Sequence, residues 1–480
     1  MKNYYLVRAK YGGLDDKTEE FLKKSYWQNT YTDGTYSNII NNIKKDDILF
    51  LTDGSYIKYY AKCKNNPKNG RTIYTDNWTK LKDNIYFKPR GSYTHAIVKI
   101  NKQSLIKQLD DNISLQEVIE DFFISSLTTY DFMSLKNGNI RFSNINIFIG
   151  ENGSGKSQIL KLLYAVLLSN NQMALENENS DYEKKRVIAK NLIEVFKPDK
   201  LGNLVNIEKK ETKISIDFFS YKISFKFGEI AKKEVSKYMD DFDFKPLRKK
   251  TVFIPTKEPL SFYKGFRILY EERYLEFDKT YYELARVLEK PLQKQNQLSD
   301  IAEKMEKILN AKVKIIDGRF YLIKENKRYE MHLVAEGYRK IALLYYLLSN
   351  SALDNKSILF WDEPEANMHP KLIDDIVQFL VILANKGMQI FISTHSPYVI
   401  ESFNNHLKKF KIRNKKITDN DIKNIEPLDP KNLKAYLLKE KDYIELLDDK
   451  IGLIDDKLLH NFNHLTMLYD KMRDIEFENR

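Results

Sequence analysis

The feature that most constrains this chain is the segment Gly150–Ser157, which reads GENGSGKS. It matches the phosphate-binding pattern G-x-x-x-x-G-K-[ST] at every fixed position. Glycines are needed there because backbone N–H groups must turn inward around phosphate oxygens, in conformations that a Cβ disfavours. The pattern predicts these nucleotide-binding residues: Asn152, Gly153, Ser154, Gly155, Lys156 and Ser157.

The sequence around this phosphate loop has the order that the motif requires. Residues 145–149 form an apolar run typical of a buried strand, and apolar residues recur at helical spacing from Ile159 to Leu167. We expect Lys156 to reach the β- and γ-phosphates and Ser157 to offer its hydroxyl to Mg²⁺. The positive end of the helix would face the phosphates. ATP and Mg²⁺ are therefore the predicted cofactors.

Two later apolar strands end in residues suited to the same chemistry. Ser357–Trp361 is followed by Asp362 and Glu363, and Met388–Thr394 is followed by His395. Adjacent acids at the end of a buried strand are costly unless a cation is near. We expect Asp362 to hold Mg²⁺ and Glu363 to orient and polarise the attacking water.

Between these elements, Val334–Lys340 opens a predicted helix. Together, residues 123–405 resemble ABC-type ATPases of the OLD, RecF and SMC branch. The resemblance implies that His395 contacts the γ-phosphate and that Glu365–Pro370 forms the D-loop. It also implies an ABC signature that caps the nucleotide of a second subunit, so that the protein forms a homodimer around ATP. The signature residues are Ala335, Glu336 and Gly337.

The signature departs from the pattern of transport ATPases, which have a serine where this chain has Ala335. The backbone N–H groups and the helix dipole remain available there. Arg339 and Lys340 are candidates to supply the missing charge.

The run DEPEANMHP, residues 362–370, is close to ATPase subunits of anti-phage systems such as the Septu and PARIS types. This resemblance implies a sensor or switch with a separately encoded effector. Two alternatives remain open. One is a RecF-like repair ATPase, and the other is a restriction factor that reads modified bases.

The predicted fold class is α/β, an ABC-type P-loop ATPase head preceded by a small β-barrel-like domain. We expect a β-rich domain at 1–110, resembling PUA and EVE-type modules, in which Trp27 and Trp78 are candidates to line a base pocket. The remaining predicted regions are the head at 111–405, its helical insertion at about 165–330, and a basic, then helical, segment at 406–480.

Some expectations concern single segments of the head. Residues 111–123 are predicted to form a helical connection, and 213–227 alternate as a β-hairpin. By resemblance, Tyr130 and Phe132 lie where related ATPases have residues near the adenine. Similarly, Lys257 and Glu258 fall at a loop that senses Mg²⁺ and the γ-phosphate.

Composition adds weaker constraints. The 480 residues carry a formal charge of +12, which favours a nucleic-acid partner, and Lys408–Lys416 is a lysine-rich candidate contact. Cys63 is the only cysteine, so no intrachain disulfide forms, and we expect its side chain to be structural. Neither a signal peptide nor a long apolar run is evident, which predicts a cytoplasmic protein without a membrane partner.

Overall fold

The computed structural model describes residues 3–11, 15–29, 34, 36–52, 56–86, 97–100, 124–176, 180–218, 222–240, 250–273, 275–292, 298–325, 327–415, 417–439, 443–448, 452–454 and 472. Contacts divide the chain into two compact units, residues 1–122 and 123–480. The predicted helical connection at 111–123 lies outside the described residues.

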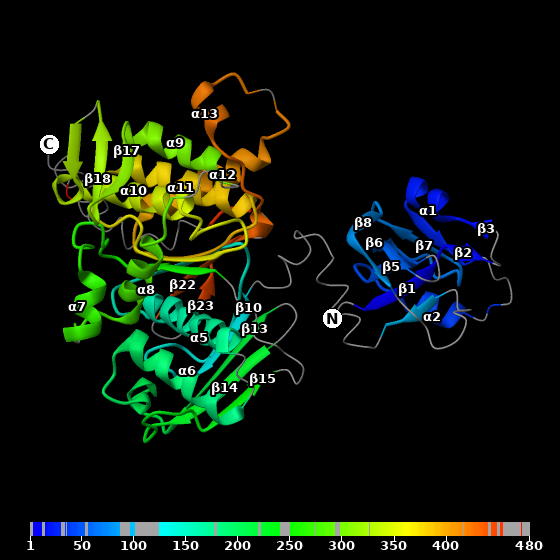
Figure 1. Cartoon of the computed structure of the whole chain (residues 1–480), viewed down its shortest axis with the longest axis horizontal. Helices are drawn as coiled ribbons and strands as arrows, with labels where there is room; N and C mark the ends of the chain where they lie inside the picture. The colour runs from blue at the N-terminus through cyan, green and yellow to red at the C-terminus, as the bar shows by residue number, and fades with distance from the viewer. Residues whose placement is uncertain are drawn as a thin grey trace. The chain divides into compact units, whose positions relative to one another are not determined.

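The first unit contains a mixed sheet in the order β4-β7-β6-β5-β1-β9, with β8 paired to β6 (Figure 1). β1 runs parallel to β5, whereas the other neighbours are antiparallel. Its elements are β1 (Tyr4–Arg8), β2 (Lys10–Tyr11), β3 (Asp15–Asp16), α1 (Thr18–Lys24), β4 (Tyr26–Gln28), α2 (Ser37–Asn41), β5 (Ile48–Thr52), β6 (Tyr56–Asn65), β7 (Thr72–Thr75), β8 (Thr79–Tyr86) and β9 (Ile97–Lys99).

The core of this unit contradicts the prediction that Trp27 lines a base pocket. Trp27 is fully buried and its Nε1 donates to the Arg8 carbonyl oxygen at 2.9 Å, so it belongs to the core and its ring has no face free for a base. Trp78 is half-buried and donates to the Tyr26 carbonyl oxygen at 3.3 Å. Cys63 is buried, as expected, and burial raises the pKa of its thiol to about 11.

The second unit has an α/β fold built on a six-stranded sheet, in the order β16-β20-β21-β12-β22-β23. The first five strands are parallel, and only β23 runs antiparallel to its neighbour. The strands are β12 (Ile145–Gly150), β16 (Thr251–Ile254), β20 (Ile358–Asp362), β21 (Gln389–Thr394), β22 (Leu433–Leu438) and β23 (Tyr443–Glu445).

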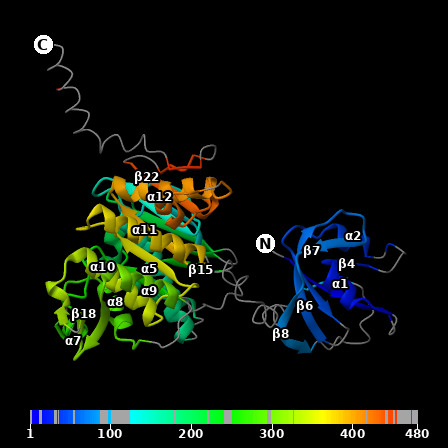
Figure 2. The ribbon, with the colours of Figure 1, turned by 90° about the horizontal axis from the view of Figure 1, so that it is seen from above.

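The two faces of this sheet belong to different cores, because successive side chains of a strand point to opposite faces. On one face, Phe253, Phe360 and Phe391 stack across three strands at centroid distances of 6.2 and 5.0 Å. They pack with α5 (Lys156–Glu176) and α6 (Asp181–Phe196). The opposite face packs against these elements: α8 (Lys279–Leu288), α9 (Ser299–Leu309), α10 (Glu336–Ser349), α11 (Pro370–Asn385) and α12 (Pro397–Lys411). Figure 2 shows several of these helices from above.

A separate antiparallel sheet, here called the β-layer, has the order β11-β10-β13-β14-β15. Its inner face packs on α5 and α6. Its strands are β10 (Ile124–Tyr130), β11 (Gly138–Arg141), β13 (Glu211–Phe218), β14 (Lys222–Gly228) and β15 (Lys237–Asp240). The β13–β14 pair confirms the predicted hairpin.

The predicted insertion at 165–330 is not wholly helical. Besides its helices it contains the predicted hairpin of β13 and β14, together with β15, β16 and a small three-stranded sheet. The elements not yet named are η1 (Leu201–Leu204), α7 (Phe266–Arg273), β17 (Lys312–Ile316), β18 (Arg319–Lys324), β19 (Lys327–Glu330), η2 (Met331–Leu333), α13 (Asn420–Asn424) and η3 (Pro430–Asn432).

The segment after residue 405 also differs from the prediction. Residues 433–438 form β22, which pairs in parallel with β12 inside the six-stranded sheet. Five of its six side chains are buried, so it lacks the alternation that distinguishes a strand from a helix. The tertiary contact with β12 decided its conformation. Among the described residues, no helix is long and apolar enough to cross a membrane.

Candidate functional site

The phosphate loop lies between β12 and α5, at the carboxyl ends of the parallel strands. Gly153 and Gly155 have φ angles of +80° and +96°, which side chains with a Cβ rarely adopt. A Cβ on Gly155 would also lie 2.7 Å from Leu135 Cδ2. The backbone therefore favours glycine at both positions. The motif fixes Gly155, whereas Gly153 stands at one of its variable positions.

Lys156 folds back over this loop. Its Nζ donates to the carbonyl oxygens of Gly150 and Glu151, both at 2.8 Å. Burial lowers the pKa of Lys156, whereas the nearby carboxylates, foremost Glu363 and Asp362, oppose that shift. The predicted phosphate-binding lysine thus lies within electrostatic reach of the predicted acid pair.

Ser157 and Asp362, the predicted metal ligands, are in direct contact. Ser157 Oγ donates to Asp362 Oδ1 at 2.8 Å, and Ser393 Oγ donates to the same oxygen. Thr256 Oγ1 donates to Asp362 Oδ2 at 3.3 Å. Mg²⁺ prefers oxygen ligands and usually takes one or two from the protein, with water and phosphate completing the shell. The hydroxyl of Ser157 and the carboxylate of Asp362 fit that requirement.

Glu363 and His395 also meet. His395 Nδ1 lies 3.2 Å from Glu363 Oε1, at the ends of adjacent strands β20 and β21. Glu363 has a φ of +49°, a strained conformation for this residue type. Its N–H is held by the Ser393 carbonyl oxygen at 3.2 Å. The backbone strain marks Glu363 as a candidate for chemistry.

Three residues at this edge were not predicted individually: Thr256, Ser393 and Glu365. Glu365 is buried and its Oε1 accepts from Thr394 Oγ1 at 2.6 Å and from the His395 N–H at 3.2 Å. Its Oε2 is buried with no hydrogen-bond donor among the described residues. The position of each residue, at or just after a strand end, was the available signal.

The predicted signature residues begin helix α10. Ala335 is the N-cap residue, and its side chain makes no capping hydrogen bond. Glu336 Oε2 accepts from Asn367 Nδ2 at 2.9 Å, which joins the helix to the predicted D-loop. Gly337 is buried, and a Cβ there would lie 3.0 Å from Leu372 Cδ1.

The structure contradicts the suggestion that Arg339 or Lys340 supplies a free charge to the signature. Lys340 is fully buried, and its Nζ donates to the carbonyl oxygens of Glu363, Pro364 and Ala366 at 3.2, 3.4 and 2.9 Å. Arg339 Nε forms an ion pair with the buried Glu258 at 2.6 Å. Both cations are engaged inside their own subunit.

The residues predicted near the adenine and in the γ-phosphate-sensing loop have different positions in the structure. Phe132 is fully buried and packs edge-on against Phe196, which excludes it from stacking on a base, whereas Tyr130 is exposed at the end of β10. In the loop after β16, Thr256 contacts Asp362, whereas Lys257 is exposed and Glu258 pairs with Arg339. Burial raises the pKa of Glu258, and the charge of Arg339 opposes that shift.

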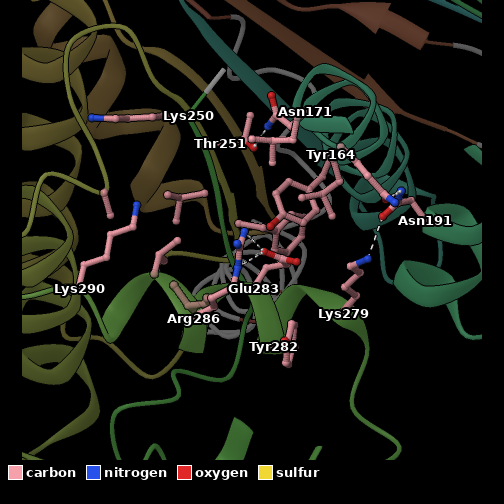
Figure 3. Close-up of a pocket in the computed structure, with 18 residues that line it drawn as sticks. Tyr164, Asn171, Asn191, Lys250, Thr251, Lys279, Tyr282, Glu283, Arg286 and Lys290 are labelled. Carbon is pink, nitrogen blue, oxygen red and sulfur yellow. Dashed lines mark hydrogen bonds and ion pairs between the residues drawn. The ribbon is translucent and has the colours of Figure 1, made fainter. Parts of the chain in front are cut away.

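A separate hollow of about 300 Å³ lies beside β16, lined by residues of α5, α6 and α8 (Figure 3). Three of its cations form ion pairs. Lys279 pairs with Glu194, Arg286 pairs with Glu283 at 2.6 Å, and Lys250 pairs with Asp354 at 2.7 Å. These local pairs compensate three of its positive charges.

The chain is similar to a protein family, to a phage protein and to several solved structures. Residues 145–401, more than half of the chain, match the family described as "AAA domain, putative AbiEii toxin, Type IV TA system". The Old nuclease of Escherichia phage P2 is 29% identical over 149 residues, which are 28% of this chain and 25% of that protein. The chain thus matches a quarter of that relative's length.

Three solved structures are similar at low identity. An SMC head bound to the C-winged helix domain of ScpA has a TM-score of 0.40 at 12% identity, covering 68% of this chain and 99% of that one. The SMC head from Thermotoga maritima has 0.35 at 12%, covering 67% and 98%. RecF with ATP has 0.34 at 14%, covering 68% and 99%.

The extent of the family match, together with the phosphate loop and the acids at the ends of its neighbouring strands, allows a conclusion about the head. The chain belongs to the AAA-domain family described as putative AbiEii toxin of a type IV toxin–antitoxin system, and it is a P-loop ATPase.

Proposed function

We propose that this protein hydrolyses ATP in a Mg²⁺-dependent reaction and acts as the sensor or switch of a prokaryotic anti-phage system. The observation that carries the catalytic part is the 2.8 Å contact between Ser157 Oγ and Asp362 Oδ1. It brings the hydroxyl of the phosphate loop and the acid of a distant strand to one point, where Mg²⁺ and the phosphates of ATP would meet.

The residues at this edge have distinct proposed roles. Asn152–Gly155 would surround the phosphates with backbone N–H groups, and Lys156 would exchange its loop carbonyls for phosphate oxygens. Ser157 and Asp362 would hold Mg²⁺, which neutralises phosphate charge when bound. Glu363 would orient the attacking water and accept its proton. His395, 3.2 Å from Glu363, would contact the γ-phosphate.

The signature turn, Ala335 to Gly337, acts on a second copy in this proposal. Its N–H groups and helix dipole would meet the γ-phosphate held by a partner, so two ATP molecules would lie between two heads. Because its cations are engaged internally, backbone donors provide the interaction in trans.

The defence role is supported by two similarities. The matching family's description names a putative toxin of a toxin–antitoxin system, and the matched relative is a phage nuclease. We infer that the protein works in the cytoplasm with a separately encoded effector and with nucleic acid. A RecF-like repair ATPase is the second candidate, because its ATP chemistry would be the same.

The catalytic proposal is tested by measuring phosphate release from ATP with purified protein, with and without Mg²⁺. Glu363→Gln should bind ATP normally while turnover falls about 100-fold or more, since a positioned base contributes factors of that order. Glu401→Gln, an exposed glutamate on α12, is the matched control. Unchanged turnover in Glu363→Gln would overturn the assignment.

The defence proposal needs the protein in its own host. The Glu363→Gln variant, tagged and purified with Mg²⁺ and ATP, should retain the ATP-bound dimer together with its effector. A stoichiometric nuclease or toxin-like subunit would support a defence switch. Recovery of only this chain and DNA would favour the repair alternative.

A base-reading role for the first unit is the third candidate. Because Trp27 is buried, such reading would depend on other groups, such as Trp78. Titration of the full-length protein with modified and with plain oligonucleotides would measure whether it prefers modified bases. Equal affinity for both would reject base reading.

A further inference from the structure

The outer face of the β-layer has side chains arranged in rows across its strands. Registered pairs place Lys213 opposite Lys226, and Lys226 opposite Lys237. Tyr130 of β10 extends this lysine row, since it pairs with Lys213. The next row inward on the same face joins Thr128, Ser215, Ser224 and Met239.

Three adjacent lysines are an unfavourable arrangement for a sheet by itself, because like charges directly opposite each other destabilise strand pairing. Glu211 partly compensates them, with contacts of 2.8 Å to Lys226 and 3.7 Å to Lys213. Lys237 has no ion-pair partner within the part of the chain that the structure describes. The lysine row therefore keeps a net positive charge.

The opposite end of the same face carries less positive charge, because its row contains one arginine, Arg141, and the ion pair of Asp217 with Lys222. Asp217 pairs with Lys222 at 3.2 Å and accepts a hydrogen bond from Ser126 Oγ at 2.8 Å. Positive charge is thus concentrated at the Tyr130 end. Two more exposed lysines, Lys209 and Lys210, line a hollow beside Tyr130.

The shape of this face suits a polymer with flat bases. A depression of about 360 Å³ lies over the hydroxyl row and is bordered by Tyr130 and Met239, which are 49% and 51% exposed. These two side chains lie on strands separated by β13 and β14 (Figure 1). An exposed aromatic ring offers a stacking surface for an unpaired base, and lysines contact the backbone phosphates.

We propose that the outer face of the β-layer binds single-stranded nucleic acid. The lysine row contacts the phosphates, Tyr130 stacks on a base, and the hydroxyls of Thr128, Ser215 and Ser224 form the floor. A duplex fits less well, because its bases are stacked internally and leave nothing for Tyr130 to contact.

This surface is close in the chain to the nucleotide site. After Tyr130, the chain turns back towards the phosphate loop, where Ser134 Oγ contacts Gln158 Oε1 at 3.0 Å. Leu135 packs against Gly155. The inference deepens the nucleic-acid part of the proposed function by naming the surface and the kind of nucleic acid. It stands if hydrolysis is absent, because it rests on the charge and shape of a different surface.

The test measures binding of full-length Glu363→Gln protein to a fluorescein-labelled 20-nucleotide oligo(dT) by anisotropy, across a salt series. Adding Lys213→Glu and Lys237→Glu should weaken binding at least about tenfold and reduce the salt slope. Tyr130→Ala should weaken oligonucleotide binding about fivefold or more, because stacking of one base on an aromatic ring raises affinity by a factor of about that size. Circular dichroism checks that each variant is folded.

The matched control is Lys304→Glu with Lys307→Glu, which makes the same charge change at two exposed positions on α9, a helix with no proposed contact with nucleic acid. It should lower affinity less than threefold. Equal losses from both double variants would overturn the proposal, since they would indicate only non-specific charge attraction. So would a 20-base-pair duplex that binds as tightly as the single strand, or an acidic polyglutamate peptide that displaces the oligonucleotide at equal concentration.

Discussion

The strand ends of the six-stranded sheet and the first turn of α10 carry the two halves of the proposed ATP chemistry, and they are built differently. At the strand ends, functional side chains bond to one another, as Ser157, Asp362 and Ser393 do. At α10, the charged side chains bond inward to loops of the same subunit, and backbone groups are left for the outside. In the dimer that we propose, the strand ends would act on the nucleotide of their own subunit, whereas the first turn of α10 would act on that of the partner.

Lys340 connects the two halves. It lies on the signature helix, yet all three of its hydrogen bonds reach the loop that carries Glu363. Movement of α10 against a partner would therefore be transmitted to the backbone of the proposed catalytic glutamate. A lysine near the proposed phosphate site can thus act by holding a loop, without contacting phosphate itself.

The largest effect is expected from a substitution at the strand ends of the six-stranded sheet. Asp362→Asn should lower Mg²⁺-dependent ATP turnover by about 100-fold or more, because it removes the charge proposed to hold the metal. Phosphate release at saturating ATP measures this. Asp199→Asn, at an exposed aspartate after α6, is the control and should keep full turnover. Normal turnover in Asp362→Asn would show that the metal lies elsewhere.

The second effect is expected from replacing Lys340, which connects α10 to the loop that carries Glu363. Lys340→Met keeps the length of the side chain but removes the Nζ donor from three loop carbonyl oxygens, of which only that of Glu363 keeps another donor among the described residues, the Ala366 N–H. We expect a cost of about 1–3 kcal/mol in stability. Thermal unfolding should show a lower midpoint, and turnover should fall more than ATP affinity does. Lys371→Met, at an exposed position on α11, is the control. If turnover and affinity fall equally, Lys340 acts only through stability.

A smaller effect is expected at Thr256, which donates a hydrogen bond to the proposed metal ligand Asp362. Thr256→Val should raise the Mg²⁺ concentration needed for half-maximal turnover about fivefold, equivalent to about 1 kcal/mol for one hydrogen bond to Asp362. Thr256→Ser keeps the hydroxyl and should restore the wild-type requirement. A serine variant as impaired as valine would indicate that packing matters at this position.

The smallest effect is a pH dependence. Burial lowers the pKa of Lys340 below its ordinary 10.5, although nearby carboxylates, foremost Glu336 and Glu365, oppose the shift. Between the lowered pKa and 10.5 the unfolded chain binds more protons, so this lysine makes stability rise with pH there. Relative to Lys340→Met, the wild-type midpoint of urea unfolding should therefore gain as pH increases through this alkaline window. A constant difference would contradict the lowered pKa.

The sequence predicted the phosphate loop well because its requirements are local. Gly153 and Gly155 must adopt positive φ, and the strand and helix beside them have clear apolar patterns. It identified Asp362, Glu363 and His395 as strand-end residues, and the structure places them at one edge. Their catalytic roles remain proposals. The hairpin of β13 and β14 was equally clear, since alternation marks a half-buried strand.

The failures have a common physical reason. Trp27 and Phe132 have side chains that suit either a core or a base pocket, and only packing shows that both are buried. The strand at 433–438 is apolar on both faces, so its periodicity could not separate strand from helix. Thr256 and Glu365 look ordinary in the sequence, and their importance comes from contacts with distant residues.

The sequence alone determined that this chain has a phosphate loop of the ATP-binding kind, with acids and a histidine at the ends of two further strands. The tertiary structure decided which cations are enclosed and which face solvent. Arg339 and Lys340 are enclosed by loops from their own subunit, whereas the lysines of the β-layer share one exposed face. Charge is a property of each residue, but its partners depend on which strands and helices pack together.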